Sequence, residues 1–192
     1  MTRQDSKKAY TRSEDEKRKG AAENLEDFKS HLIDLPASIC QEVQGAVERC
    51  FPKDTLELEI KVRLSIACTF FLLHLALRSI EILLPKTRAS EYQSWLLKET
   101  GAAGYKEFFS QDIVPSKFSE YFSTFFISNY HVLDERLRRC SMPSLSDDPD
   151  DQDICKAFEM WLGSHINRLS GLDLLVEDLW KIWKERLCSY FH

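Results

Sequence analysis

The chain has 192 residues, 43% of them hydrophobic and 30% charged, an ordinary composition for one soluble domain with a single core. Its 26 lysines and arginines stand against 31 aspartates and glutamates, and this negative balance argues against broad attraction to nucleic-acid phosphates. The six cysteines form no Cys-x-x-Cys pair, which excludes a zinc ribbon or a thioredoxin-type redox pair, and we expect reduced thiols.

The first twenty residues form a polar segment that differs from the rest of the chain. They carry seven basic and four acidic residues, whereas residues 21–192 carry nineteen and twenty-seven. A segment with so few apolar residues cannot bury enough surface to fold, so we expect residues 1–20 to be a disordered charged leader. The leader also lacks the apolar run of a secretory signal, and we expect the protein to be cytoplasmic.

Helical periodicity dominates residues 21–192. Between the prolines the apolar residues recur at intervals of three and four, and no segment shows the alternation of a β-strand. The pattern predicts a first helix over about residues 21–33 and a second over 36–50, where Ser38 and Gln41 have the spacing of a capping box. The fold class that follows is all-α.

A third helix is predicted over about residues 55–84, and its middle is apolar on every face. Fourteen uncharged residues, 64–77, lie between two arginines. At about 1.5 Å per residue they cover about 21 Å, which is short of a hydrocarbon layer about 30 Å thick. We therefore expect a central core helix, with Phe70 and Leu73 buried, and no membrane span.

Two further helices are predicted in the middle of the chain. The first covers about residues 90–98, and Gly101 ends it. The second opens at Pro115 and Ser116 and carries an apolar stripe at helical spacing, which is typical of a helix that packs in the core. The stripe consists of Phe118, Phe122, Phe125, Phe126, Tyr130, Leu133 and Leu137.

An acidic segment, residues 141–153, contains five aspartates, two prolines and no basic residue. This composition predicts a solvated linker. Residues 154–190 then show the pattern of two helices separated at Ser170 and Gly171, with Ser170 as the N-cap of the last one. Together the segments predict a single helical bundle of five to seven helices around the central apolar helix.

The sequence contains none of the common catalytic motifs: a dinucleotide-binding glycine loop, a Walker A loop, GxSxG and HExxH are all absent. His131, near Asp134 and Glu135, has the pattern of an exposed polar face. His74, in the apolar helix, is either a structural histidine or a heme ligand, and the structural interpretation is favoured because no second feature of a heme pocket accompanies it. We predict no catalytic, cofactor-binding or metal site.

One formal motif match lies at the C-terminus. Five residues separate Arg186 from His192, which fits the pattern of HEPN ribonucleases, an arginine followed after four to six residues by a histidine. With twelve arginines and five histidines in the chain, about one such match arises by chance. A metal-independent ribonuclease that uses these two residues is kept as an alternative.

Basic residues beside tryptophans give a weak indication of nucleic-acid binding. Three of them interleave with two tryptophans in the last predicted helix. Because the chain beyond the leader is acidic overall, the simpler interpretation is that the tryptophans pack while the basic groups face water. The residues concerned are Lys181, Lys184, Arg186, Trp180 and Trp183.

The sequence is rich in packing signals and lacks a converging catalytic set. We therefore predict a non-enzymatic protein–protein interaction module, a regulatory or assembly subunit that contacts another protein through a helical face. Self-association is a further option, and RNA is a weakly supported partner. The alternatives are the HEPN-like ribonuclease and a Bcl-2-like bundle that binds partner helices or membranes, although motifs of that family are not evident.

Overall fold

The computed structural model describes residues 28, 30–52, 55–109, 116–141, 153–166 and 169–191. The chain divides into two compact units, residues 1–34 and 35–192. In the first unit the described residues form a helical turn, in which the Leu32 N–H donates to the Phe28 carbonyl at 3.1 Å. The predicted leader and most of the first predicted helix lie outside the described residues.

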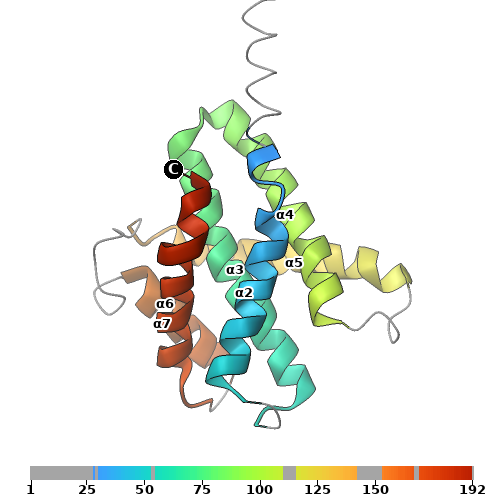
Figure 1. Ribbon diagram of the computed structural model, residues 1–192, viewed down its shortest axis with the longest axis vertical. Coiled ribbons are helices and arrows are strands. Elements are labelled where there is room, and N and C mark those ends of the chain that lie inside the picture. The colour runs from blue at the N-terminus through green and yellow to red at the C-terminus, as the bar shows by residue number, and fades with distance from the viewer. Residues whose placement is uncertain are drawn as a thin grey trace, which may run out of the picture. The chain divides into compact units, whose positions relative to one another are not determined.

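Six α-helices make up most of the described part of the second unit (Figure 1). They are α2 (Leu35–Cys50), α3 (Leu58–Leu83), α4 (Lys86–Phe108), α5 (Ser116–Leu137), α6 (Asp153–His165) and α7 (Leu172–Ile182). After α7 the chain continues as a π-helical turn, η2 (Trp183–Leu187), and a 3-10 turn, η3 (Cys188–Phe191). The described residues contain no strand, and the prediction of an all-α bundle is confirmed.

Helix α3 is the central element that the sequence predicted (Figure 1). Every residue in 64–77 is buried, and Phe70 and Leu73 are 2% and 0% exposed, as predicted. By length and composition alone α3 could cross a membrane, but 72% of its apolar 18-residue window is buried inside the structure. Binding of α3 to a membrane would therefore require this helix to leave the bundle.

Aromatic side chains join α3 to helices on different sides of it. Phe71 stacks on Phe158 of α6, with ring centroids 4.4 Å apart and an interplanar angle of 11°. Phe70 meets Phe126 of α5 edge to face, with centroids 4.8 Å apart. Such pairs add about 0.5–1.5 kcal/mol each to the free energy gained by burying the rings. Successive residues of α3 thus bind it to α5 and to α6.

Helix α4 is much longer than predicted. The expected helix covered residues 90–98, whereas α4 runs from Lys86 to Phe108. The prediction that Gly101 ends it is wrong, because this glycine serves close packing between helices: a Cβ atom there would lie 3.2 Å from the ring of Phe126. A glycine inside a helix costs about 1 kcal/mol in propensity, and here it lets α4 approach α5.

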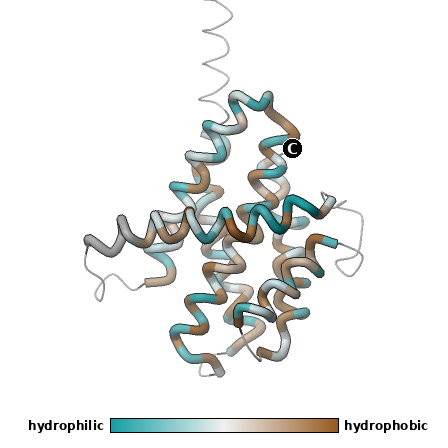
Figure 2. The backbone as a smooth tube through the Cα atoms, turned by 180° about the vertical axis from the view of Figure 1, so that it is seen from behind, coloured by the Kyte–Doolittle hydropathy of each residue, from teal (hydrophilic) through white to brown (hydrophobic). Residues whose placement is uncertain are grey.

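Helix α5 crosses the other helices on the face shown in Figure 2. Its N-terminal residue agrees with the predicted start, and most of the predicted stripe lies in the core. Phe125 is the exception, because 42% of it is exposed, so its assignment to the core is wrong. The side chain of Phe118 lies outside the described residues. The buried members are Phe122, Phe126, Tyr130, Leu133 and Leu137.

Helices α6 and α7 follow the acidic segment. Helix α6 begins at Asp153, the last residue of the predicted linker, and residues 142–152 lie outside the described part of the chain. The N-cap of α7 is Gly171, with a φ angle of 89°, so the prediction of Ser170 is wrong. Left-handed backbone of this kind favours a residue without a Cβ atom.

The C-terminal turns pack on α2. The Arg186 guanidinium donates to both carboxylate oxygens of Glu42, at 2.6 and 2.7 Å. The hydroxyl oxygens of Ser38 and Tyr190 lie 3.2 Å apart. Because α2 already includes Ser38 in its first turn, the predicted capping box is wrong, and the serine instead contacts a residue 152 positions away.

Candidate functional site

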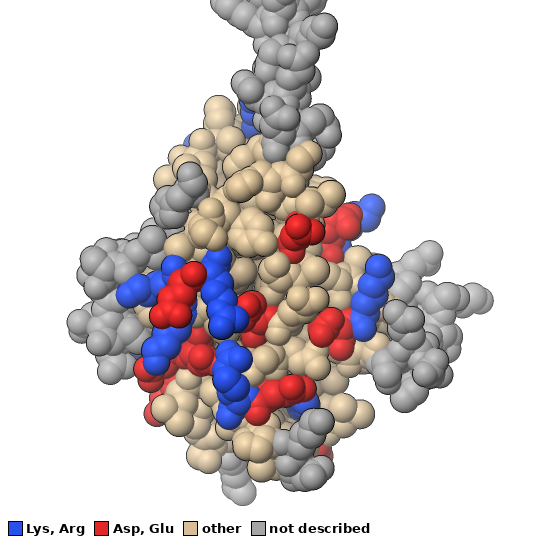
Figure 3. Space-filling model, in the orientation of Figure 1, with Lys and Arg blue, Asp and Glu red and all other residues tan. Residues whose placement is uncertain are grey.

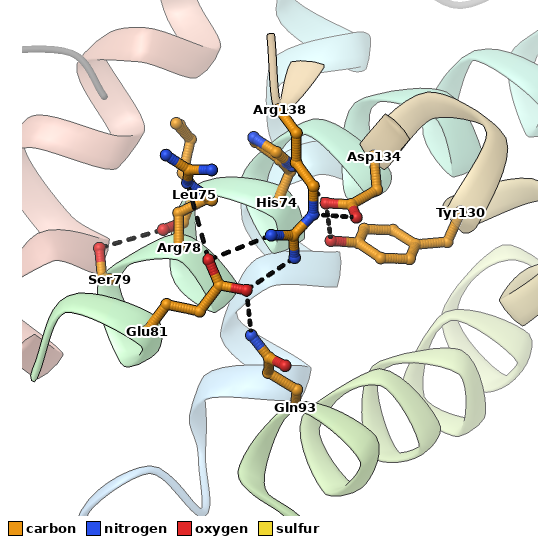
Figure 4. Close-up of polar contacts among 9 residues, drawn as sticks. All are labelled: His74, Leu75, Arg78, Ser79, Glu81, Gln93, Tyr130, Asp134 and Arg138. Atoms are coloured by element: carbon orange, nitrogen blue, oxygen red, sulfur yellow. Dashed lines mark hydrogen bonds and ion pairs between the residues drawn. The ribbon is translucent and has the colours of Figure 1, made fainter. Parts of the chain in front are cut away.

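A buried polar network joins α3 to α5 (Figure 4). The Nδ1 atom of His74 lies 2.7 Å from Oδ1 of Asp134, and the Tyr130 hydroxyl donates to the same oxygen at 2.9 Å. Arg138 donates through Nε to the other carboxylate oxygen at 2.6 Å and through Nη2 to Glu81 at 2.7 Å. His74 and Asp134 are only 1% and 8% exposed, so this part of the network lies in the interior.

The network reaches α4 through the Glu81 carboxylate. Gln93 donates to Oε1 at 2.7 Å, and the Nε atom of Arg78 lies 3.9 Å from Oε2 (Figure 4). Glu81 and Arg138 are partly open to water, whereas His74 is enclosed. One chain of contacts therefore fixes α3, α4 and α5 relative to one another.

Hydrogen bonds favour the ionised form of the two carboxylates in this network. Burial alone would raise the pKa of the Asp134 carboxyl, but the three hydrogen bonds that it accepts hold this pKa well below its usual range. Burial likewise opposes ionisation of Glu81, whose pKa is lowered by hydrogen bonds, led by that from Arg138. The pKa of Tyr130 is raised by burial and by the neighbouring carboxylate, so its hydroxyl stays a donor.

These contacts join the buried His74 of α3 to Asp134 of α5. Its Nδ1 atom is occupied by Asp134, and a substrate could reach the pair only if the helices moved apart. Among the described residues no three His, Cys, Asp or Glu side chains are grouped so that they could hold a metal ion. The assignment of Asp134 to an exposed face beside His131 is wrong. The signal for its true place is the four-residue spacing of Phe126, Tyr130 and Asp134, which puts the aspartate on the buried face.

A groove of about 350 Å³ opens between α3, α5 and α6. Its floor is apolar and almost entirely buried, while Phe125 stands exposed at its edge. Phe125 is the residue of the aromatic stripe that was expected in the core. The lining residues are Arg63, Ile66, Ala67, Phe70, Phe125, Asn129, Trp161, His165 and Ile166.

Three polar side chains surround this floor. Arg63 forms an exposed ion pair with Glu59, one turn earlier on α3. Asn129 donates to a backbone carbonyl of its own helix at 2.8 Å. The Nδ1 atom of His165 donates to the Trp161 carbonyl at 2.8 Å, and the two rings stack with centroids 4.3 Å apart. None of the described residues that line the groove is acidic.

The surface of α2 and α7 carries both signs of charge, interspersed (Figure 3). Lys181 pairs with Glu177 at 2.7 Å. Trp180 and Trp183 are 1% and 3% exposed, so they pack as the simpler interpretation expected and present no ring for bases to stack on.

The ribonuclease alternative stays a prediction. The Arg186 side chain is exposed and bound to Glu42, and His192 lies outside the described residues. Incubation of labelled RNA and chelator with the wild-type protein and with His192→Ala would test it.

None of the six cysteines forms a disulfide. Cys40 and Cys68 are buried in α2 and α3, and burial raises the pKa of both thiols well above the usual range. Cys40 also donates to the backbone carbonyl of Thr100 at 3.7 Å. These two thiols therefore pack as small apolar groups.

The groove is the better candidate site, because it is open to solvent, whereas His74 and Asp134 are buried and the polar groups of their network bind one another. Comparisons of the chain with protein-family models, with curated proteins and with solved structures find no match in any of the three.

Proposed function

We propose that the protein is a non-enzymatic interaction module, a regulatory or assembly subunit, and that it binds another protein through the groove between α3, α5 and α6. The observation that carries this proposal is the groove itself, with an apolar floor beside the exposed ring of Phe125. Apolar surface rimmed by polar groups is typical of sites that a partner covers. The ionisable groups of the buried network are paired with one another, which favours binding over catalysis.

A protein segment fits this groove better than a small ligand does. A volume of about 350 Å³ is near the lower end of the range of ligand pockets. Small ligands are usually enclosed over most of their surface, whereas Phe125 and Arg63 leave the rim of this groove open to water. An anchoring side chain presented by a larger partner closes such a groove from outside.

The cysteines support the proposal that the module acts in the cytoplasm. None of the six forms a disulfide, and three of them are buried. Reduced cysteines are the rule in reducing compartments, whereas disulfides form and persist outside them.

Capture of partners by matched variants tests the proposed function. The full chain, Phe125→Asp and Val132→Asp are each cross-linked to proteins of the source cell, and the captured proteins are compared. Both substitutions place a carboxylate on α5 at an exposed apolar position, but only Phe125 lines the groove. We expect at least one protein to be captured by the wild type and Val132→Asp and lost from Phe125→Asp.

Thermal unfolding of the three proteins provides the control for folding. Light scattering shows in the same series whether the captured partner is a second copy of the chain. If the three proteins capture the same set, the groove does not bind a partner and the proposal is wrong.

A further inference from the structure

We infer that the groove takes a short acidic segment of a partner protein, in which one bulky apolar side chain lies next to a carboxylate. This inference rests on the proposed function and adds the chemistry of the partner. The apolar side chain packs on the floor of the groove, and the carboxylate binds the Arg63 guanidinium at the rim.

The side chains on the floor of the groove explain why an apolar residue of the partner is preferred. Ile66, Ala67 and Phe70 of α3 and Trp161 of α6 line the groove. The alanine side chain stops at Cβ, so it takes less room than its large neighbours. A Leu, Ile, Met or Phe side chain that packs there removes its own apolar surface and that of Phe125 from water.

The side chains at the rim of the groove explain why an acidic residue of the partner is preferred. The planar guanidinium of Arg63 can bind both oxygens of a carboxylate. His165 donates through Nδ1 to the Trp161 carbonyl and brings no negative charge to the rim. No acidic residue is among the described lining residues, and Arg63 is the group there that complements an anion.

The ion pair between Arg63 and Glu59 does not prevent Arg63 from binding a carboxylate of the partner protein. The side chains of Arg63 and Glu59 are 67% and 71% exposed, and an ion pair so open to water is weak. A carboxylate that arrives with an apolar anchor meets the guanidinium beside low-dielectric surface, where the attraction between charges is stronger. Arg63 can therefore leave Glu59 for the partner.

The charge of the whole chain limits how acidic the partner is. The net charge of −5 repels a polyanion such as a nucleic acid at long range. One or two carboxylates beside an apolar anchor meet the Arg63 guanidinium with little of this repulsion. The favoured partner is therefore a short acidic and apolar segment.

Selection from a library of short random peptides, displayed on phage, tests the inference with the full-length protein. Enriched peptides are synthesised, and their affinities are measured by fluorescence polarisation. We expect them to share a bulky apolar residue flanked by Asp or Glu. We expect Arg63→Glu to weaken their binding about tenfold and, in a fresh selection, to favour Lys or Arg in place of the acid.

Arg136→Glu is the matched control, because it makes the same change of charge at an exposed position of α5 outside the groove. It should leave the affinities within about twofold. Peptides that lose binding in Phe125→Asp but show no acidic preference would overturn this inference and leave the proposed function intact. Peptides that bind Phe125→Asp as well as the wild type would contradict both.

A selection that enriches nothing counts against an acidic protein segment. Decanoate, a small apolar acid, is then titrated against the wild type and Phe125→Asp. Binding that depends on Phe125 would show that the groove takes a small molecule, and the inference of a protein segment would be wrong.

Discussion

Asp134 shows how one ionised side chain can hold two helices together inside a bundle. One of its oxygens accepts from His74 and Tyr130 and the other from Arg138. A buried carboxylate is tolerated when its oxygens have strong donors, and a charged donor gives the strongest of these bonds. His74 benefits as well, because a buried polar group without a partner costs about 1–3 kcal/mol.

Asp134→Asn should destabilise the protein by about 3 kcal/mol at pH 7, because the uncharged amide leaves Arg138 and His74 without their common anion. Since folding lowers the pKa of Asp134, its contribution to stability is present above its unfolded pKa of about 3.9 and is lost as the pH falls through the folded value. The difference in unfolding free energy between wild type and variant should therefore shrink below about pH 4.

Urea unfolding between pH 7 and pH 3 measures this difference. Glu135→Gln, an exposed neutralisation on the same helix, is the control and should change stability by less than about 0.5 kcal/mol. A difference for Asp134→Asn that is independent of pH would mean that the carboxylate contributes nothing through its charge.

Of the pair formed by His74 and Asp134, the sequence indicated only the histidine. An imidazole in the middle of an apolar helix has to find a polar partner, and that requirement was visible at His74. The partner was not, because Asp134 lies 60 positions away and the crossing of α3 and α5 brings it close. The groove could not be predicted for a similar reason. Helical spacing places Phe125 on the edge of a wide apolar stripe, but whether its side chain is covered or exposed depends on how the neighbouring helices pack.

At the scale of a helix, α4 shows that a glycine inside a helix can mark a contact instead of an end. The ring of Phe126 lies where a Cβ atom of Gly101 would approach it at 3.2 Å, and a Cβ atom at Gly104 would lie 3.2 Å from the ring of Phe108. The sequence predicted the presence of this helix but not its length. Propensity alone cannot separate a C-terminal glycine from one that another helix requires.

Gly101→Ala should destabilise the protein by about 1–2 kcal/mol, although alanine has the higher helix propensity. The added methyl group meets Phe126, which is fully buried and held by Phe70 and Phe122, so the ring cannot move aside. Urea unfolding at neutral pH provides the measurement.

Gly163→Ala is the matched substitution on α6, where a Cβ atom meets nothing within 4 Å. It should stabilise the protein by about 0.5–1 kcal/mol through propensity alone. An equal increase in unfolding free energy for both substitutions would show that α4 and α5 are not in close contact at Gly101.

At the scale of the whole molecule, residues 35–192 form one compact unit that includes α6 and α7. Phe158 of α6 stacks on α3, and Arg49 of α2 donates to Asp178 of α7 at 2.8 and 3.1 Å. The last two helices are therefore part of the same core as the first four.

A protein cut between Ser146 and Asp147, through an inserted site for a specific protease, should remain associated. The two fragments should co-elute in gel filtration and separate in denaturant, because each exposes a large apolar surface alone. The uncut insertion variant is the control. Independent elution of a folded N-terminal fragment would assign α6 and α7 to a separate domain.

The fold class and the central helix could be predicted because they depend on patterns within a segment. Helical spacing and a fourteen-residue run without charge define α3 whatever surrounds it. The cap at Gly171 and the contact between Ser38 and Tyr190 were not predictable, because loop geometry and distant residues determine them.

The six cysteines give the molecule a set of built-in chemical reporters. Alkylating reagents attack the thiolate, and Cys68, fully enclosed in α3, offers none until the helices around it separate. Cys50, Cys140 and Cys188 lie nearer the surface, in other parts of the bundle. The order in which the thiols are modified therefore ranks local openings of the native protein by their free energy, with no label added.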